Sequence, residues 1–181
     1  MRVDEGLADA ALFDGAVACE LTARVRLQAG APPLGSAEAA ERLLRDLAMV
    51  EERRGEVEDS AHPPDPALRR LEAKLDLTLQ LLAQVLPALA SPTPCAVRLS
   101  ARGLRIDGAD AALALTDGVA TLAWQPADGL PLLAHLPVRC LARHGTASWW
   151  AFEPLEPALA DLLERHVFRL HRRWLAAQRR G

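Results

Sequence analysis

The apolar residues of this chain repeat with two different periods, and the change between them limits the folds that the chain can adopt. Residues 17–28 alternate apolar and polar side chains, as do several segments between residues 96 and 152. This alternation is typical of strands with one buried face. Residues 36–89 instead carry apolar side chains every three or four positions, which predicts helices. The sequence therefore predicts an α+β fold whose sheet is interrupted, after its first strand, by a long helical insertion.

The insertion is expected to contain two helices joined by a linker at residues 59–65. Ser36 is a favourable N-cap for the first helix, and Asp65 followed by Pro66 is a favourable start for the second. The second helix carries a heptad pattern over residues 68–89. The apolar side chains on its seam, which we assign to self-association, are Leu68, Leu71, Leu75, Leu82, Val85 and Leu89.

The positions that border this seam are charged near its start and apolar near its end. Glu72 and Lys74 border the first half, whereas Leu79, Leu81 and Leu86 border the second. A two-stranded coil leaves such positions in water, so the wide apolar face favours a coiled-coil bundle of three or four helices. We expect a homo-oligomer and favour a tetramer. The alternative is an ordinary helix that packs within its own domain.

Short strands are expected again after residue 92. Their turn-to-turn spacing predicts a small antiparallel barrel or sandwich, and Pro157 opens a C-terminal helix. The predicted domains are a barrel of residues 1–35 and 92–181 and an inserted helical pair of residues 36–91. The expected strands are two within residues 96–106 and one each at 111–115, 119–125, 132–142 and 148–152.

The bend between the first two of these later strands has the sequence Arg98-Leu99-Ser100-Ala101-Arg102-Gly103, followed by Leu104-Arg105-Ile106. Together with the order of hairpins and the terminal helix, it resembles the PilZ domain, the receptor module for cyclic di-GMP. That family carries [D/N]xSxxG before an apolar strand. The resemblance covers residues 10–30 and 94–178, and the helical insertion resembles the atypical, oligomer-forming branch.

The resemblance implies that the Asp or Asn and the Ser of the motif meet a guanine edge, and that the Gly permits a close approach. It also implies an RxxxR arginine pair, before the first strand, that clamps phosphates. The corresponding ligand-binding residues here are Arg98, Ser100, Arg102 and Gly103.

This chain departs from the family pattern at two points. Arg98 stands where the family has an acceptor, and an arginine only donates hydrogen bonds. No arginine lies between Arg2 and Arg24, so the pair before the first strand is missing. We therefore expect Ser100 and Gly103 to serve the bend, cyclic di-GMP to bind weakly or not at all, and no other cofactor to bind.

Other function classes find little support in the sequence. No GxSxG, HExxH or Cys/His metal-ligand spacing occurs, and the five histidines are interpreted as surface or hydrogen-bonded residues, so we expect no enzyme and no metal site. A net charge of -3 argues against general binding to nucleic acid or membrane surfaces. The arginines around Trp174 leave phosphate binding as an alternative to a solvated helix end. Without a signal peptide pattern, we expect a cytoplasmic protein with no membrane insertion.

The leading hypothesis is a non-catalytic bacterial signalling adaptor of the cyclic di-GMP pathway. It would self-associate through its helices and contact other signalling proteins. The alternative is a functional cyclic di-GMP receptor that uses arginines at non-standard positions.

Overall fold

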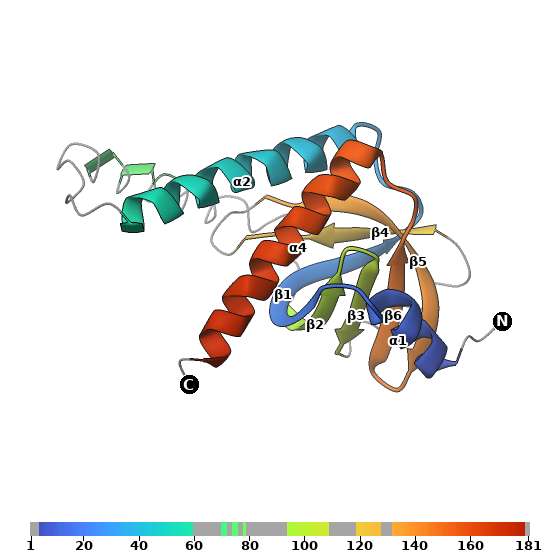
Figure 1. Cartoon of the computed structure of the whole chain (residues 1–181). Coiled ribbons are helices and arrows are strands. Elements are labelled where there is room, and N and C mark those ends of the chain that lie inside the picture. The colour runs from blue at the N-terminus through green and yellow to red at the C-terminus, as the bar shows by residue number, and fades with distance from the viewer. Residues whose placement is uncertain are drawn as a thin grey trace.

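The computed structural model describes residues 4–59, 70–71, 74–75, 78, 94–108, 119–127 and 132–179. Its main elements are shown in Figure 1. In chain order they are α1 (Glu5–Phe13), β1 (Ala18–Ala29), α2 (Ser36–Asp59), β2 (Pro94–Ser100), β3 (Gly103–Asp107), β4 (Val119–Trp124), β5 (Ala134–His144), β6 (Ala147–Phe152) and α4 (Pro157–Gln178).

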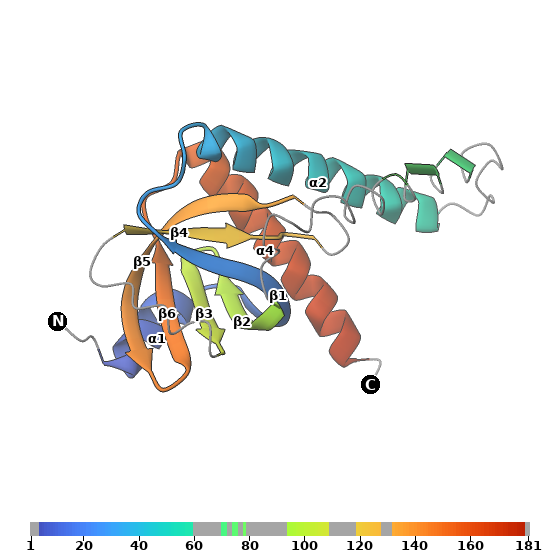
Figure 2. The ribbon, with the colours of Figure 1, turned by 180° about the vertical axis from the view of Figure 1, so that it is seen from behind.

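The described strands close into an antiparallel barrel in the order β1-β2-β3-β6-β5-β4 (Figures 1 and 2). β1 closes it, because residues 18–24 pair with β2 and residues 25–29 pair with β4. The alternating side chains Cys19, Val25 and Leu27 are buried in the core, as the period of residues 17–28 predicts. The α+β class with a small antiparallel barrel is therefore confirmed.

α4 lies diagonally across the barrel and contributes one face to its core (Figure 1). Leu159, Leu163 and Val167 are fully buried in the same cluster as the inward side chains of the strands. The expected start at Pro157 is confirmed.

α2 packs on α4 and β5 with its N-terminal half, where Ala40, Leu44 and Leu47 are buried. Its C-terminal half extends past the barrel in both views (Figures 1 and 2). Val50, which fits the apolar repeat of residues 36–89, is 54% exposed there. The first helix of the predicted insertion is thus confirmed as a helix, and half of it belongs to the core of the barrel. The boundary of the inserted unit at residue 36 stays a prediction.

The remaining expectations divide between confirmed elements and segments outside the described residues. The two strands around the bend and the strands at 119–125, 132–142 and 148–152 are confirmed as β2 to β6. The strand expected at 111–115 and most of the second helix of the insertion lie outside the described residues. α1 is an element that the sequence analysis did not predict; Asp4 caps it by accepting a hydrogen bond from the Gly6 amide at 3.4 Å.

His166 of α4 is fully buried beside Trp124, with the two rings edge to face at 5.4 Å. His166 is thus a core residue and not a surface residue, and the Pro126 backbone is its hydrogen-bonding neighbour. Burial lowers the pKa of His166 from 6.5 to about 4, and nearby Glu51 and the Pro126 backbone oppose that shift only in part.

We predict that the free energy of unfolding decreases as the pH falls from 6.5 towards 4, because the unfolded state then binds a proton that the folded state does not. Between pH 7 and pH 5 this contribution is about 2 kcal/mol. Urea denaturation at both pH values measures it. His166→Phe removes this part of the slope, whereas His144→Gln, at an exposed histidine, retains it. Equal slopes in the wild type and the His166 variant would contradict a buried neutral imidazole.

Candidate functional site

The motif that resembles a ligand site forms the tight turn between β2 and β3. Ser100 and Gly103 are directly opposed across the two strands, and the Arg102 amide donates to Ser100 Oγ at 3.1 Å. The serine side chain therefore closes the turn by binding the backbone two residues on. All four predicted ligand-binding residues come together at this turn.

Gly103 is required by the close approach of neighbouring chain segments. A Cβ at this position would lie 2.2 Å from the Trp150 carbonyl oxygen, 2.8 Å from a methyl carbon of Leu12 and 2.9 Å from the Ala151 Cα. Two of these atoms belong to the backbone of β6, which pairs with β3. The absence of a side chain at Gly103 therefore lets β6 and α1 pack against the turn. This packing agrees with the expectation that Gly103 serves the bend.

α1 covers the outer face of the barrel at this turn. The Ser100 hydroxyl donates to the Leu12 carbonyl at 2.8 Å, with the Gly103 carbonyl as a second acceptor at 3.3 Å. The Arg102 guanidinium donates to the Asp14 carbonyl at 3.0 Å. Ser100 is fully buried as a result. The C-terminal end of α1 thus occupies the groups that the motif would offer to a ligand.

Asp9 of α1 makes a second set of contacts with the same face. One carboxylate oxygen accepts from Arg98 Nη1 at 3.0 Å, and the other accepts from Trp149 Nε1 at 3.0 Å. The Arg98 guanidinium also lies over the Phe13 ring, 4.3 Å from its centroid. Arg98, the residue that departs from the family motif, therefore has an acceptor and an aromatic partner within the chain.

A row of charged side chains crosses the barrel beside α1. Glu20, Arg98 and Arg105 are register partners on β1, β2 and β3. Arg105 pairs with Asp107 at 2.9 Å and lies 5.3 Å from the centroid of the Trp149 ring. Opposed arginines repel each other across a sheet, and here each one has its own carboxylate.

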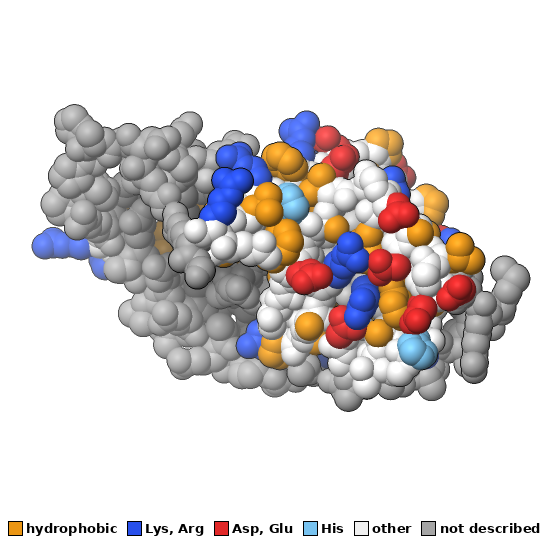
Figure 3. All heavy atoms as spheres, turned by 60° about the horizontal axis from the view of Figure 1, so that its bottom comes forward, with side chains coloured by type: hydrophobic (Ala, Val, Ile, Leu, Met, Phe, Trp, Pro, Cys, Tyr) orange, Lys and Arg blue, Asp and Glu red, His pale blue; other side chains and the backbone are white. Residues whose placement is uncertain are grey.

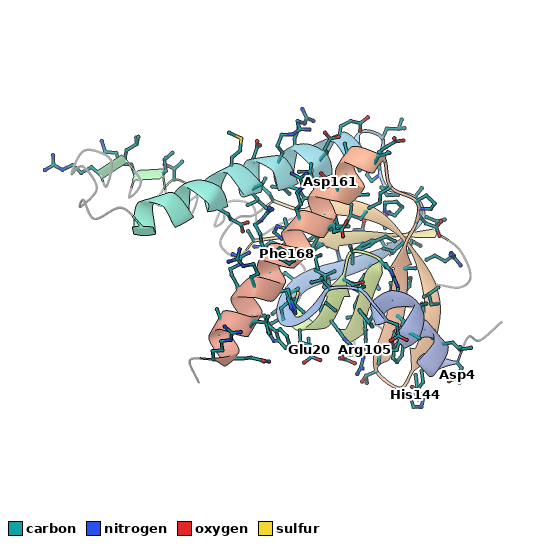
Figure 4. All side chains as sticks on the ribbon, in the orientation of Figure 1. Asp4, Glu20, Arg105, His144, Asp161 and Phe168 are labelled. Carbon is teal, nitrogen blue, oxygen red and sulfur yellow. The ribbon has the colours of Figure 1, made fainter. Side chains whose placement is uncertain are left out.

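These side chains border a groove of about 590 Å³. In Figure 3 the blue cations of this face lie among red carboxylates, and Figure 4 shows Glu20 and Arg105 at the same edge of the barrel. The face is therefore polar and balanced in charge while α1 is in place.

Four arginines of the later RxxxR spacings, at residues 139–143, 165–169 and 169–173, pair with carboxylates. Arg169 and Arg173 both contact Glu51 of α2, at 2.6 Å and 2.9 Å. Arg139 donates to Glu153 at 2.9 Å, and Arg165 pairs with Asp161 at 3.0 Å. Glu51 and its two arginines fix α2 against α4 at the point where α2 leaves the barrel.

The residues assigned to self-association are only partly described. Leu71 and Leu75 lie in helical segments and are 54% and 55% exposed. Leu68, Leu82, Val85 and Leu89 lie outside the described residues.

The sequence analysis missed the partners that α1 supplies. They are Asp9, Leu12, Phe13 and Asp14, together with Trp149 beneath the helix. A signal was present, because residues 4–14 contain four acidic and no basic side chains, whereas the motif contains two arginines.

A comparison with known protein families gives a match that agrees with this barrel and its terminal helix. The family model described as "Atypical PilZ domain, cyclic di-GMP receptor" matches residues 44–180. The chain belongs to the atypical PilZ family. The matched range of this PilZ model begins inside α2, so it omits α1 and β1.

One solved structure with the PilZ fold is similar over nearly the whole chain. It is a protein from Xanthomonas campestris, described as a new tetrameric PilZ domain self-assembled via an unusual helical bundle. The identity is 35% over 94% of this chain and 97% of that chain, with a TM-score of 0.73. No curated protein sequence matches this PilZ chain significantly.

Among the described residues of this PilZ protein, no helix is long and apolar enough to cross a membrane, and no group of three or more His, Cys, Asp or Glu side chains could hold a metal ion. None of the three cysteines forms a disulfide. Burial raises the pKa of the Cys19 thiol to about 11, so this thiol stays protonated at neutral pH.

We predict that Gly103→Ala lowers the free energy of unfolding by about 3 kcal/mol, because the added methyl group can only be accommodated by moving the backbone of β6. Urea denaturation measures the change. Gly6→Ala is the matched control: nothing lies within 4 Å of its Cβ position, and alanine favours a helix. Similar stabilities for the Gly103 variant and the wild type would contradict the packing of the turn.

Proposed function

We propose that this chain is a non-catalytic signalling adaptor of the cyclic di-GMP pathway and binds the nucleotide weakly or not at all. The observation that carries the proposal is the occupation of the motif by α1. Arg98, Ser100 and Arg102 each donate to α1 or to the residue after it. A nucleotide at this turn would have to displace α1 and replace those hydrogen bonds.

The cost of displacing α1 is large compared with typical ligand affinities. Leu12 and Phe13 are 1% and 5% exposed, and exposing two such side chains costs about 3–6 kcal/mol before α1 regains conformational freedom. That range corresponds to a loss of roughly 100-fold to 10,000-fold in affinity. A receptor affinity for cyclic di-GMP would therefore need additional contacts to offset the displaced helix.

We further propose that the chain forms a homotetramer through its inserted helices. Met49 and Val50 are 52% and 54% exposed where α2 extends past the barrel, and Leu71 and Leu75 are more than half exposed. Apolar side chains at this spacing on helices favour burial against other helices. The Xanthomonas campestris relative, described as tetrameric by way of a helical bundle, supports this proposal.

We predict that isothermal titration of the full-length protein with cyclic di-GMP gives no saturable heat at tens of micromolar protein. The reason is that the motif donors are already bound by α1. A micromolar or tighter dissociation constant, which means a binding free energy of about -8 kcal/mol, would contradict the proposal. It would favour the alternative, a receptor that uses arginines at non-standard positions.

We predict that the double variant Leu71→Glu, Leu75→Glu dissociates the assembly, because charges at the seam cannot be buried without partners. Sedimentation velocity at micromolar protein measures the mass. Leu34→Glu is the matched control, since Leu34 is fully exposed on the loop before α2, and its assembly should equal that of the wild type. An unchanged mass in the double variant would contradict self-association through this helix.

A further inference from the structure

The barrel face beneath α1 presents hydrogen-bond donors, and α1 presents acceptors. Every side-chain hydrogen bond described between the two runs in the same direction. The donors on the barrel are Arg98 Nη1, Ser100 Oγ, Arg102 Nη1 and Trp149 Nε1. The acceptors are both Asp9 carboxylate oxygens and the carbonyls of Leu12 and Asp14.

This set of acceptors is typical of the C-terminal turn of an acidic helix. The last carbonyls of a helix have no partner within the helix and carry partial negative charge. Here they meet Ser100 and Arg102, while Asp9, one turn earlier, meets Arg98. Residues 4–14 carry four acidic and no basic side chains, so charge complementarity supports the same fit.

α1 is packed separately from the main core. Ala8, Leu12 and Phe13 form a small cluster with Ala142 and Trp149, and the main core contains no residue of α1. A helix of nine residues is not stable alone in water. Because its side chains lie outside the main core, a local opening of α1 would leave the strand pairing intact.

We propose that this face is a docking site for the C-terminal turn of an acidic helix of a partner protein, and that α1 is its built-in occupant. The partner helix would carry Asp or Glu one turn before its end and an aromatic side chain at its end, as Asp9 and Phe13 do in α1. Competition between the two helices would then control access to the face. This inference names the partner class of the proposed adaptor and so rests on that function.

A labelled peptide with the sequence of residues 4–14 tests the recognition directly. In the full-length Asp9→Ala variant, α1 lacks the carboxylate that binds Arg98 and Trp149, whereas the added peptide retains it. The peptide should therefore compete better with α1 for the barrel face. Fluorescence anisotropy should show at least tenfold tighter peptide binding to Asp9→Ala than to the wild type. Adding Arg98→Ala to that variant should reduce the binding at least tenfold, and so should raising the salt from 50 mM to 500 mM.

The matched control is Glu5→Ala, which changes α1 at its exposed pair with His144, away from the motif. It should bind the peptide as weakly as the wild type does. Equal binding to the wild type and Asp9→Ala, or binding that survives Arg98→Ala, would overturn the docking site. So would a larger oligomer of Asp9→Ala in sedimentation, because it would assign the face to a second copy of this chain.

Hydrogen exchange of the wild type provides a readout that needs no variant. The amides of Ala8 and Asp14 form helical hydrogen bonds at the two ends of α1. They should exchange at least 100-fold faster than the amides of β2 and β6. Equal protection would make α1 a fixed part of the barrel and overturn the proposal. Neither experiment depends on cyclic di-GMP or on the helical bundle, so its failure is distinguishable from failure of the proposed function.

Discussion

The hydrogen bond from the Ser100 hydroxyl to the Leu12 carbonyl holds the N-terminal helix on the β2–β3 turn. The turn can form this contact because Gly103 leaves no side chain between α1 and the backbone of β6. Asp9 then reaches both Arg98 and Trp149 from the same helix. Together these contacts bury Ser100 and give the donors of the turn partners within the chain. Burial of the apolar end of α1 stabilises that state.

Residue periodicity predicted a small barrel or sandwich and the last helix, and the resemblance to the PilZ domain favoured the barrel. Alternation in residues 17–28 depends only on one face being buried, and β1 forms with bounds of Ala18–Ala29. The SxxG bend was also predictable, since a serine that binds its own turn is a local property. Ser100 and Gly103 therefore lie where the sequence places them, between two short strands.

The contacts of the candidate site could not be predicted from the same patterns. α1 is too short to show a clear helical repeat, and Asp9 meets Arg98 and Trp149 across 89 and 140 residues of sequence. For a related reason the sequence left open whether His166 lies at the surface or in the core, because only the packing of α4 against Trp124 shows that its ring is buried. In α2, Val50 fits the apolar repeat but lies where the helix has passed the edge of the barrel.

The indole N–H resonances of the four tryptophans offer the most direct test of α1 on the motif in solution. Trp149 donates to Asp9, whereas Trp150 donates to Ser148 inside the barrel. In ¹H–¹⁵N spectra of wild type and Asp9→Ala at neutral pH, the Trp149 signal should move clearly and the Trp150 signal should stay in place. A Trp149 signal that is the same in both proteins would show that α1 does not cover the turn.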